Sequence, residues 1–187
     1  ILMCYYTRFR FGKLQKKYNF DPWHCNGNWY CRPYQRKAVK LIDNLNPKSV
    51  IEIGCGLGEV ITRVNANYKV GYDIETSVIE AAKSIRGLKV NFKVGTGKDV
   101  VEDNIDVLVA INWIHNLSPS QLTNFLKPFY SRVSFFLLEG IYKDEPGYKF
   151  CHDFNFLKKQ IKLIDVVDGG IGEPRKLMLF KVIKNVC

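Results

Sequence analysis

The sequence predicts an α/β fold in which a mostly parallel β-sheet carries helices on both faces. Short apolar runs of strand length alternate with apolar residues at helical spacing from about residue 33 to residue 140. The run at 49–54 leads directly into three alternating glycines, Gly54, Gly56 and Gly58. Such a turn lets a ligand approach the backbone at the edge of a sheet. The chain has 187 residues and is 47% hydrophobic, which suits one domain with a full core.

The N-terminal residues differ in composition from the rest of the chain. The first 40 residues contain nine lysines or arginines and one acid, Asp21, in a chain of net charge +10. They are also rich in aromatic residues, and they contain turn-forming sequences without a long hydrophobic period. We therefore predict a basic, aromatic-rich arm over residues 1–32, partly helical and laid over a domain formed by residues 33–187.

Strand and helix patterns alternate through the predicted domain. A helix opens at Pro33 and ends at Asn46-Pro47. Predicted strands cover 49–54, 69–73, 89–94, 105–111 and 133–138. One predicted helix follows the first strand and ends at about residue 66. A second begins at about residue 76, after the second strand, and a third is capped by Ser118, after the fourth strand. Two closing strands, 162–167 and 176–183, flank a hairpin loop.

The glycine loop differs from a dinucleotide-binding fingerprint, because Glu59 stands where the third glycine of that motif would be. A carboxylate before the loop, Glu52, suits a ligand with cationic groups better than one with phosphates. The segment E-I-G-C-G-L-G at 52–58 resembles motif I of the class I S-adenosylmethionine (SAM)-dependent methyltransferases. Residues 70–74 resemble the second strand of that family, which ends in an acid. Residues 105–112 resemble its fourth strand, with motif IV at the end.

This resemblance implies a Rossmann-like class I methyltransferase fold with seven strands, the last one antiparallel and inserted between strands 5 and 6. It implies an enzyme that uses SAM and releases S-adenosylhomocysteine. Glu52 would reach the amino group of the cofactor, Asp73 would bind the ribose hydroxyls, and Ile74 would pack on the adenine, for which Asp99 is a candidate partner. The expected cofactor-binding residues are Glu52, Gly54, Cys55, Gly56, Gly58, Asp73, Ile74, Asp99 and Asn112.

Residues 112–116 follow the fourth strand, where motif IV places catalytic or substrate-facing groups. They contain neither the N-P-P-Y sequence of amino methylases nor an acidic metal-binding cluster. His115 is the candidate base that takes the proton of an acceptor hydroxyl, and His24 is the second candidate. The alternative for His115 is a structural histidine bonded to a backbone carbonyl. We expect no metal site.

The cysteines at 4, 25, 31, 55, 151 and 187 are scattered and form no C-x-x-C pair. This pattern predicts a reducing, cytoplasmic setting. The apolar runs are too short and too interrupted to predict a segment that crosses a membrane.

The acceptor is expected to be a small or glycan-like polar molecule that is methylated on oxygen. The charge of the arm would attract an anionic acceptor, and the expected substrate contacts are Trp23, Trp29, Tyr30, Arg32 and Trp113. In the alternative, the aromatic residues of the arm only pack on the domain. Segments 20–24 and 30–34 also look like those of small methyltransferases of surface-polysaccharide pathways.

Two other functions stay open from the sequence. Basic and aromatic residues together suit an RNA methyltransferase, although no accessory RNA-binding module accompanies them. A SAM-binding protein without catalysis is the other alternative, because the residues at motif IV match no established catalytic pattern.

Overall fold

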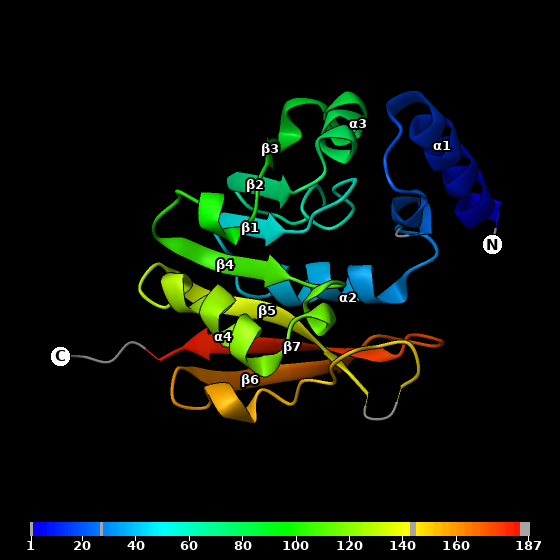
Figure 1. Ribbon diagram of the computed structural model, residues 1–187. Coiled ribbons are helices and arrows are strands. Elements are labelled where there is room, and N and C mark those ends of the chain that lie inside the picture. The colour runs from blue at the N-terminus through cyan, green and yellow to red at the C-terminus, as the bar shows by residue number, and fades with distance from the viewer. Residues whose placement is uncertain (1, 27, 143–144, 184–187) are drawn as a thin grey trace.

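The computed structural model describes residues 2–26, 28–142 and 145–183. Seven strands form one sheet in the order β3-β2-β1-β4-β5-β7-β6 (Figure 1). The strands are β1 (Ser49–Ile53), β2 (Tyr68–Asp73), β3 (Asn91–Val94), β4 (Ile105–Ala110), β5 (Val133–Ile141), β6 (Ile161–Asp168) and β7 (Arg175–Val182). Strands β1 to β5 pair in parallel, whereas β7 is antiparallel to both of its neighbours. The predicted fold class and the inserted last strand are confirmed.

Helices cover both faces of the sheet because successive strand residues point to opposite sides. Ile51 of β1 belongs to the same apolar cluster as Leu122 of α4 (Pro119–Leu126). Its neighbour Val50 belongs to the cluster that contains Ile42 of α2 (Pro33–Asp43) and Ile79 of α3 (Thr76–Arg86). Short 3-10 helices complete the chain: η1 (Pro22–Asn26), η2 (Gly87–Lys89), η3 (Gly97–Asp99), η4 (Ile114–Asn116), η5 (Lys127–Phe129) and η6 (Asn155–Leu157).

The helix predicted between the first two strands is wrong. Residues 56–63 form consecutive turns. Gly56 and Gly58 take positive φ values of 51° and 71°, which do not continue a right-handed helix. The backbone N–H of Ile61 donates to the side chain of Glu52 at 2.9 Å, whereas in a helix it would bond to a main-chain carbonyl. The glycine loop and the buried carboxylate therefore replace a helix with a tight connection.

The N-terminal residues form a helix that packs on the rest of the molecule. Helix α1 (Leu2–Tyr18) lies beside α3, beyond the edge at which the parallel strands end (Figure 1). Phe11 of α1 and Phe20, just after it, are buried in a small apolar cluster with Leu57 and Val78. The segment is thus attached to the sheet domain through apolar side chains.

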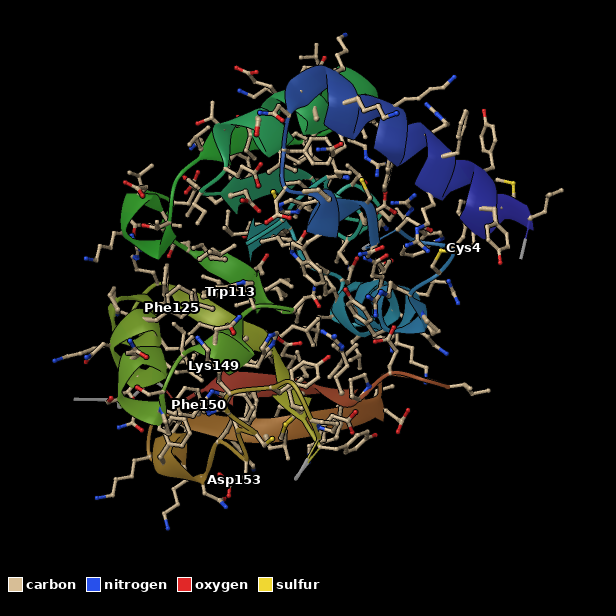
Figure 2. All side chains as sticks on the ribbon, turned by 45° about the vertical axis from the view of Figure 1, so that its right-hand side comes forward. Cys4, Trp113, Phe125, Lys149, Phe150 and Asp153 are labelled. Carbon is tan, nitrogen blue, oxygen red and sulfur yellow. A yellow bond between two sulfur atoms is a disulfide. The ribbon has the colours of Figure 1, made fainter. Side chains whose placement is uncertain are left out.

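One disulfide joins the ends of this N-terminal segment. Cys4, on the outer part of α1 (Figure 2), is bonded to Cys31, with the two Cα atoms 5.3 Å apart. This bond differs from the uniformly reduced cysteines that the sequence suggested. Spacing along the chain could not reveal it, because the turn at 19–32 brings the two residues together. Cys25, Cys55 and Cys151 are free, and Cys187 lies outside the described residues. Within the described ranges, none of the helices has the length and apolar character needed to cross a bilayer.

The contribution of the packed N-terminal segment to the stability of the protein can be tested. Phe20 is 1% exposed. Phe20→Ala should lower the free energy of unfolding by about 3 kcal/mol or more, because it removes a buried ring and leaves a cavity. Urea unfolding measures this change, with Phe9→Ala on the exposed side of α1 as the control. Equal stability of the two variants would show that the segment does not pack on the domain.

Candidate functional site

A cavity of about 1130 Å³ lies at the edge where the parallel strands end. Its walls come from the ends of β1, β2 and β4, the loop 95–98, the end of helix α4 and residues 21–24 of the N-terminal segment. The carboxyl ends of parallel strands are the usual place for ligands in open α/β sheets. Ligand pockets usually span about 300–1,000 Å³, so this cavity has room for a cofactor and part of a second molecule.

The glycine loop is enclosed by two aromatic side chains. Gly54 has φ 76°, and a Cβ at that position would lie 2.5 Å from Cδ1 of Trp113. The indole N–H of Trp113 donates to the carbonyl of Ile53 at 2.7 Å. A Cβ at Gly56 would lie 3.0 Å from Nδ1 of His24. Side chains are therefore excluded from the loop by its backbone conformation and by these two neighbours.

Trp113 also contacts the wall next to the loop at 95–98. Its ring meets Phe125 of α4 edge-to-face, with the centroids 5.1 Å apart, and Figure 2 shows the two rings side by side. A Cβ at Gly97 would lie 2.5 Å from this phenylalanine ring. Trp113 and Phe125 thus form an apolar wall beside two glycine-containing turns, which suits a flat aromatic ligand group.

Asp73 connects the end of β2 to the glycine loop. One carboxylate oxygen accepts from the backbone N–H of Gly56 at 2.8 Å, and the other accepts from the N–H of Glu75 at 3.1 Å. A carboxylate has about four lone-pair sites, so two more donors can bind the same oxygens. The position of Asp73 is therefore set by the backbone, while it keeps acceptor capacity toward the cavity.

Glu52 lies below the glycine loop and is 4% exposed. Burial raises the pKa of its carboxyl to about 8, and the N–H of Ile61 offsets only part of this effect. The side chain is therefore mostly neutral at pH 7 in the empty protein. A cation that entered the cavity beside Glu52 would favour the ionised carboxylate.

Glu75 attaches the N-terminal segment to the rim of the cavity. It accepts from the backbone N–H of Asp21 at 2.7 Å and lies 3.0 Å from Nε2 of His24. Sequence reasoning missed this residue. A possible signal was its position two residues after Asp73, at the same strand end.

A buried network of charges lies next to Asn112 at the end of β4. Glu139 of β5 accepts from Nδ1 of His115 at 2.8 Å and from Arg175 of β7 at 2.7 Å. Arg175 also donates to the side-chain oxygen of Asn112 at 2.6 Å and to Glu173 at 3.2 Å. Glu139 and Arg175 were missed, although a charged residue within the apolar run of β5 was a signal for a buried ion pair.

The cavity brings together ten of the residues expected at the site. These are Trp23, His24, Glu52, Gly54, Cys55, Gly56, Asp73, Ile74, Asn112 and Trp113. Gly58, Asp99, His115, Trp29, Tyr30 and Arg32 lie outside its lining.

Three of these outlying side chains have partners elsewhere. Asp99 accepts from the backbone N–H of Thr96 at 2.7 Å and so caps its own turn. The ring of Trp29 packs under the guanidinium of Arg63 at 4.4 Å. Arg32 pairs with Glu173 at 3.3 Å.

The lining of the cavity is acidic although the chain is basic. Its carboxylates are Asp21, Glu52, Glu59, Asp73 and Glu75. Within the described part of the chain, Lys98 is the one lysine or arginine that lines it. Glu59 is neutralised by Arg63 and Arg86. Asp21, Asp73 and Glu75 favour a cationic ligand over an anionic one, and such a ligand would also favour the ionised form of Glu52. Among the described residues, no group of three or more His, Cys, Asp or Glu side chains is placed to hold a metal ion.

Comparison with known proteins identifies the domain that contains most of the parallel strands. Residues 50–134 match the family model described as a methyltransferase domain. Residues 50–134 therefore form a methyltransferase domain, and the chain has the fold of class I SAM-dependent methyltransferases. The comparison with curated protein sequences finds no significant match.

Solved structures share the fold of this methyltransferase. The N-methyltransferase NodS from Bradyrhizobium japonicum, in complex with S-adenosylhomocysteine, is 13% identical with a TM-score of 0.69, covering 92% of this chain and 98% of that one. Magnesium protoporphyrin IX methyltransferase from Synechocystis, with bound SAM, is 10% identical with a TM-score of 0.64, covering 79% and 77%. A TehB-like SAM-dependent methyltransferase from Corynebacterium glutamicum is 15% identical with a TM-score of 0.60, covering 78% and 86%.

The buried Glu52 makes the stability of the methyltransferase depend on pH. A folded-state pKa of about 8, above the ordinary value of 4.5, means that the folded protein keeps a proton that the unfolded chain loses. The free energy of unfolding should therefore fall as pH rises from 4.5 to about 8 and level off above it. Glu52→Gln should lack this loss and melt at a higher temperature than the wild type at pH 8.

Thermal melts of the empty protein across this pH range measure the effect. Glu80→Gln, at an exposed position of α3, is the matched control and should follow the wild type. Parallel pH profiles for Glu52→Gln and the wild type would contradict a protonated Glu52.

Proposed function

We propose that this methyltransferase transfers the methyl group of SAM to a hydroxyl of a small, polar, glycan-like acceptor. The observation that carries the proposal is the shared cavity. The glycine loop and Asp73 line it together with Trp23, Tyr34 and Asn112. Cofactor and acceptor can therefore meet in one cavity, and residues 21–24 form part of its wall.

The residues of the cavity suit the chemical groups of SAM. Glu52 would bind the amino group, the loop 54–58 would pass the methionine part, and Asp73 would accept both ribose hydroxyls. Ile74, 73% exposed at the cavity wall, would pack on the adenine ring. Because Asp99 caps its own turn, we assign the edge of the adenine to the backbone of residues 95–98. Bound in this way, SAM supplies an electrophilic methyl group on a sulfonium.

The acidic lining limits which acceptors the cavity can bind. An anionic group inside the cavity would face Asp21, Asp73 and Glu75, so we favour a neutral hydroxyl at the reacting position. Trp23 is 42% exposed and offers a flat face to a sugar ring. Trp29 and Arg32 are occupied by other contacts, and we now assign them to packing of the N-terminal segment.

His115 is our candidate for the base. Glu139 accepts from its Nδ1, which leaves Nε2 as the nitrogen that can take a proton. In the proposed step the acceptor oxygen bonds to the methyl carbon, the carbon–sulfur bond breaks, and the hydroxyl proton passes to Nε2. His24 is the second candidate, since it lines the cavity directly. Entry of the acceptor between Asn112 and Tyr34 would bring it toward His115.

Binding of the cofactor through Asp73 is tested by Asp73→Asn. The change keeps the size of the side chain but removes its charge and one acceptor, so the Kd for S-adenosylhomocysteine should rise roughly ten- to hundred-fold. Isothermal calorimetry measures this value. Asp99→Asn is the control and should stay within about two-fold of the wild type if it only caps its turn. An unchanged Kd for Asp73→Asn would place the ribose contact elsewhere.

Turnover measurements with methyl-labelled SAM and a panel of free sugars and sugar nucleotides distinguish His115 from His24 as the base. His115→Ala should lower kcat about a hundred-fold or more while the Kd for S-adenosylhomocysteine changes little, because the base acts only in the transfer step. Glu139→Gln should lower kcat less. A large loss of kcat in His24→Ala together with normal turnover in His115→Ala would assign the base to His24. Carbon NMR of the product should show a methyl ether, and a methylamine would refute O-methylation.

A further inference from the structure

The side of α1 that faces away from the domain carries exposed apolar residues. Leu2, Met3, Tyr5, Tyr6 and Phe9 are between 49% and 82% exposed. The opposite side of the helix packs on the domain through Phe11, Leu14 and Tyr18. The exposed apolar residues are therefore not explained by attachment of the helix to the domain.

Helix α1 also carries five basic residues, which are Arg8, Arg10, Lys13, Lys16 and Lys17. All five are exposed, and α1 contains no acid. None of them lines the cofactor cavity. In the part of the chain that the structure describes, none of them pairs with a carboxylate. We call these cations, with the five exposed apolar residues, the outer face of α1.

The charges of the two surfaces are opposite. The cavity is lined by carboxylates, whereas the outer face of α1 has only cations. A ligand attracted by α1 is therefore a different molecule, or a different part of a molecule, from the group that reacts in the cavity. The positive charge of the arm was expected to attract an anionic acceptor. The cations of α1 lie on this second surface and not in the cavity.

We propose that the outer face of α1 binds the surface of an anionic lipid bilayer. A helix that lies in the interface inserts apolar and aromatic side chains at the headgroup boundary, while its lysines and arginines bind anionic headgroups. The outer face combines both kinds of side chain over about four turns, from Leu2 to Lys17. The proposal does not depend on which acceptor the enzyme methylates.

The geometry of the rings favours lipid over RNA. Nζ of Lys13 lies 4.5 Å above the ring of Phe9, and the guanidinium of Arg10 lies 6.0 Å from the ring of Tyr6. A nucleic-acid base would need an open ring face on which to stack, so it would have to displace these cations. At the headgroup boundary of a bilayer the rings and the cations beside them can both be accommodated, because the apolar stems of lysine and arginine lie along apolar surface while their charged ends bind headgroups.

Co-sedimentation of the full chain with vesicles tests the proposal. Vesicles of equal parts phosphatidylcholine and phosphatidylglycerol should bind the protein, and pure phosphatidylcholine should not. Lys13→Gln combined with Lys16→Gln should weaken binding about 25-fold, since each cation contributes about five-fold. Tyr6→Ala combined with Phe9→Ala should also weaken it. Lys158→Gln with Lys159→Gln, which removes two exposed cations elsewhere, is the matched control and should bind normally.

The outcomes that overturn the proposal are distinct. Absence of binding to the anionic vesicles, or equal weakening by the control variant, would refute a lipid-binding function of α1. Tighter binding to a single-stranded oligouridylate, lost in the Lys13 and Lys16 variant, would assign the surface to nucleic acid instead. Unchanged melting temperatures and affinities for S-adenosylhomocysteine exclude misfolding as the cause of any loss.

Discussion

The ion pair between Glu139 and Arg175 is the constraint around which the acceptor side of the molecule is built. The two residues lie on the antiparallel strands β5 and β7, and both are almost completely buried. Charges removed from water need partners for all of their hydrogen-bonding groups, and loss of one partner costs about 3–5 kcal/mol. Their remaining groups are satisfied by His115, Asn112 and Glu173, so the loop after β4 and the hairpin between β6 and β7 are held against the sheet.

The same network extends to the N-terminal segment. Glu173 pairs with Arg32, which precedes α2, while Glu75 on the other side of the cavity binds Asp21 and His24. Residues 21–26 and 28–32 are thus attached, through Asp21, His24 and Arg32, to loops of the sheet domain. We propose on this basis that the segment acts as a fixed wall of the active site, with only its side chains adjusting to the acceptor.

Charge is divided between two surfaces in a way that net charge does not reveal. A chain with formal charge +10 lines its large cavity with acidic side chains, and this suits the cationic sulfonium and ammonium groups of the SAM that we propose binds there. The cations of α1 are directed outward, where they attract an anionic surface. The cavity and the outer face of α1 therefore suit molecules of opposite charge.

The sequence alone determined the sheet, the glycine loop and the acid at the end of β2, because each depends on a local pattern of apolar residues, glycines and strand ends. It could not predict the turns after β1, since they depend on a hydrogen bond from Ile61 to the buried Glu52. Only the tertiary structure decided that Glu139 meets Arg175, 36 residues away, and that His24 lies over Gly56. Such contacts join residues from separate elements, and their energy comes from burial and charge pairing, which no local pattern encodes.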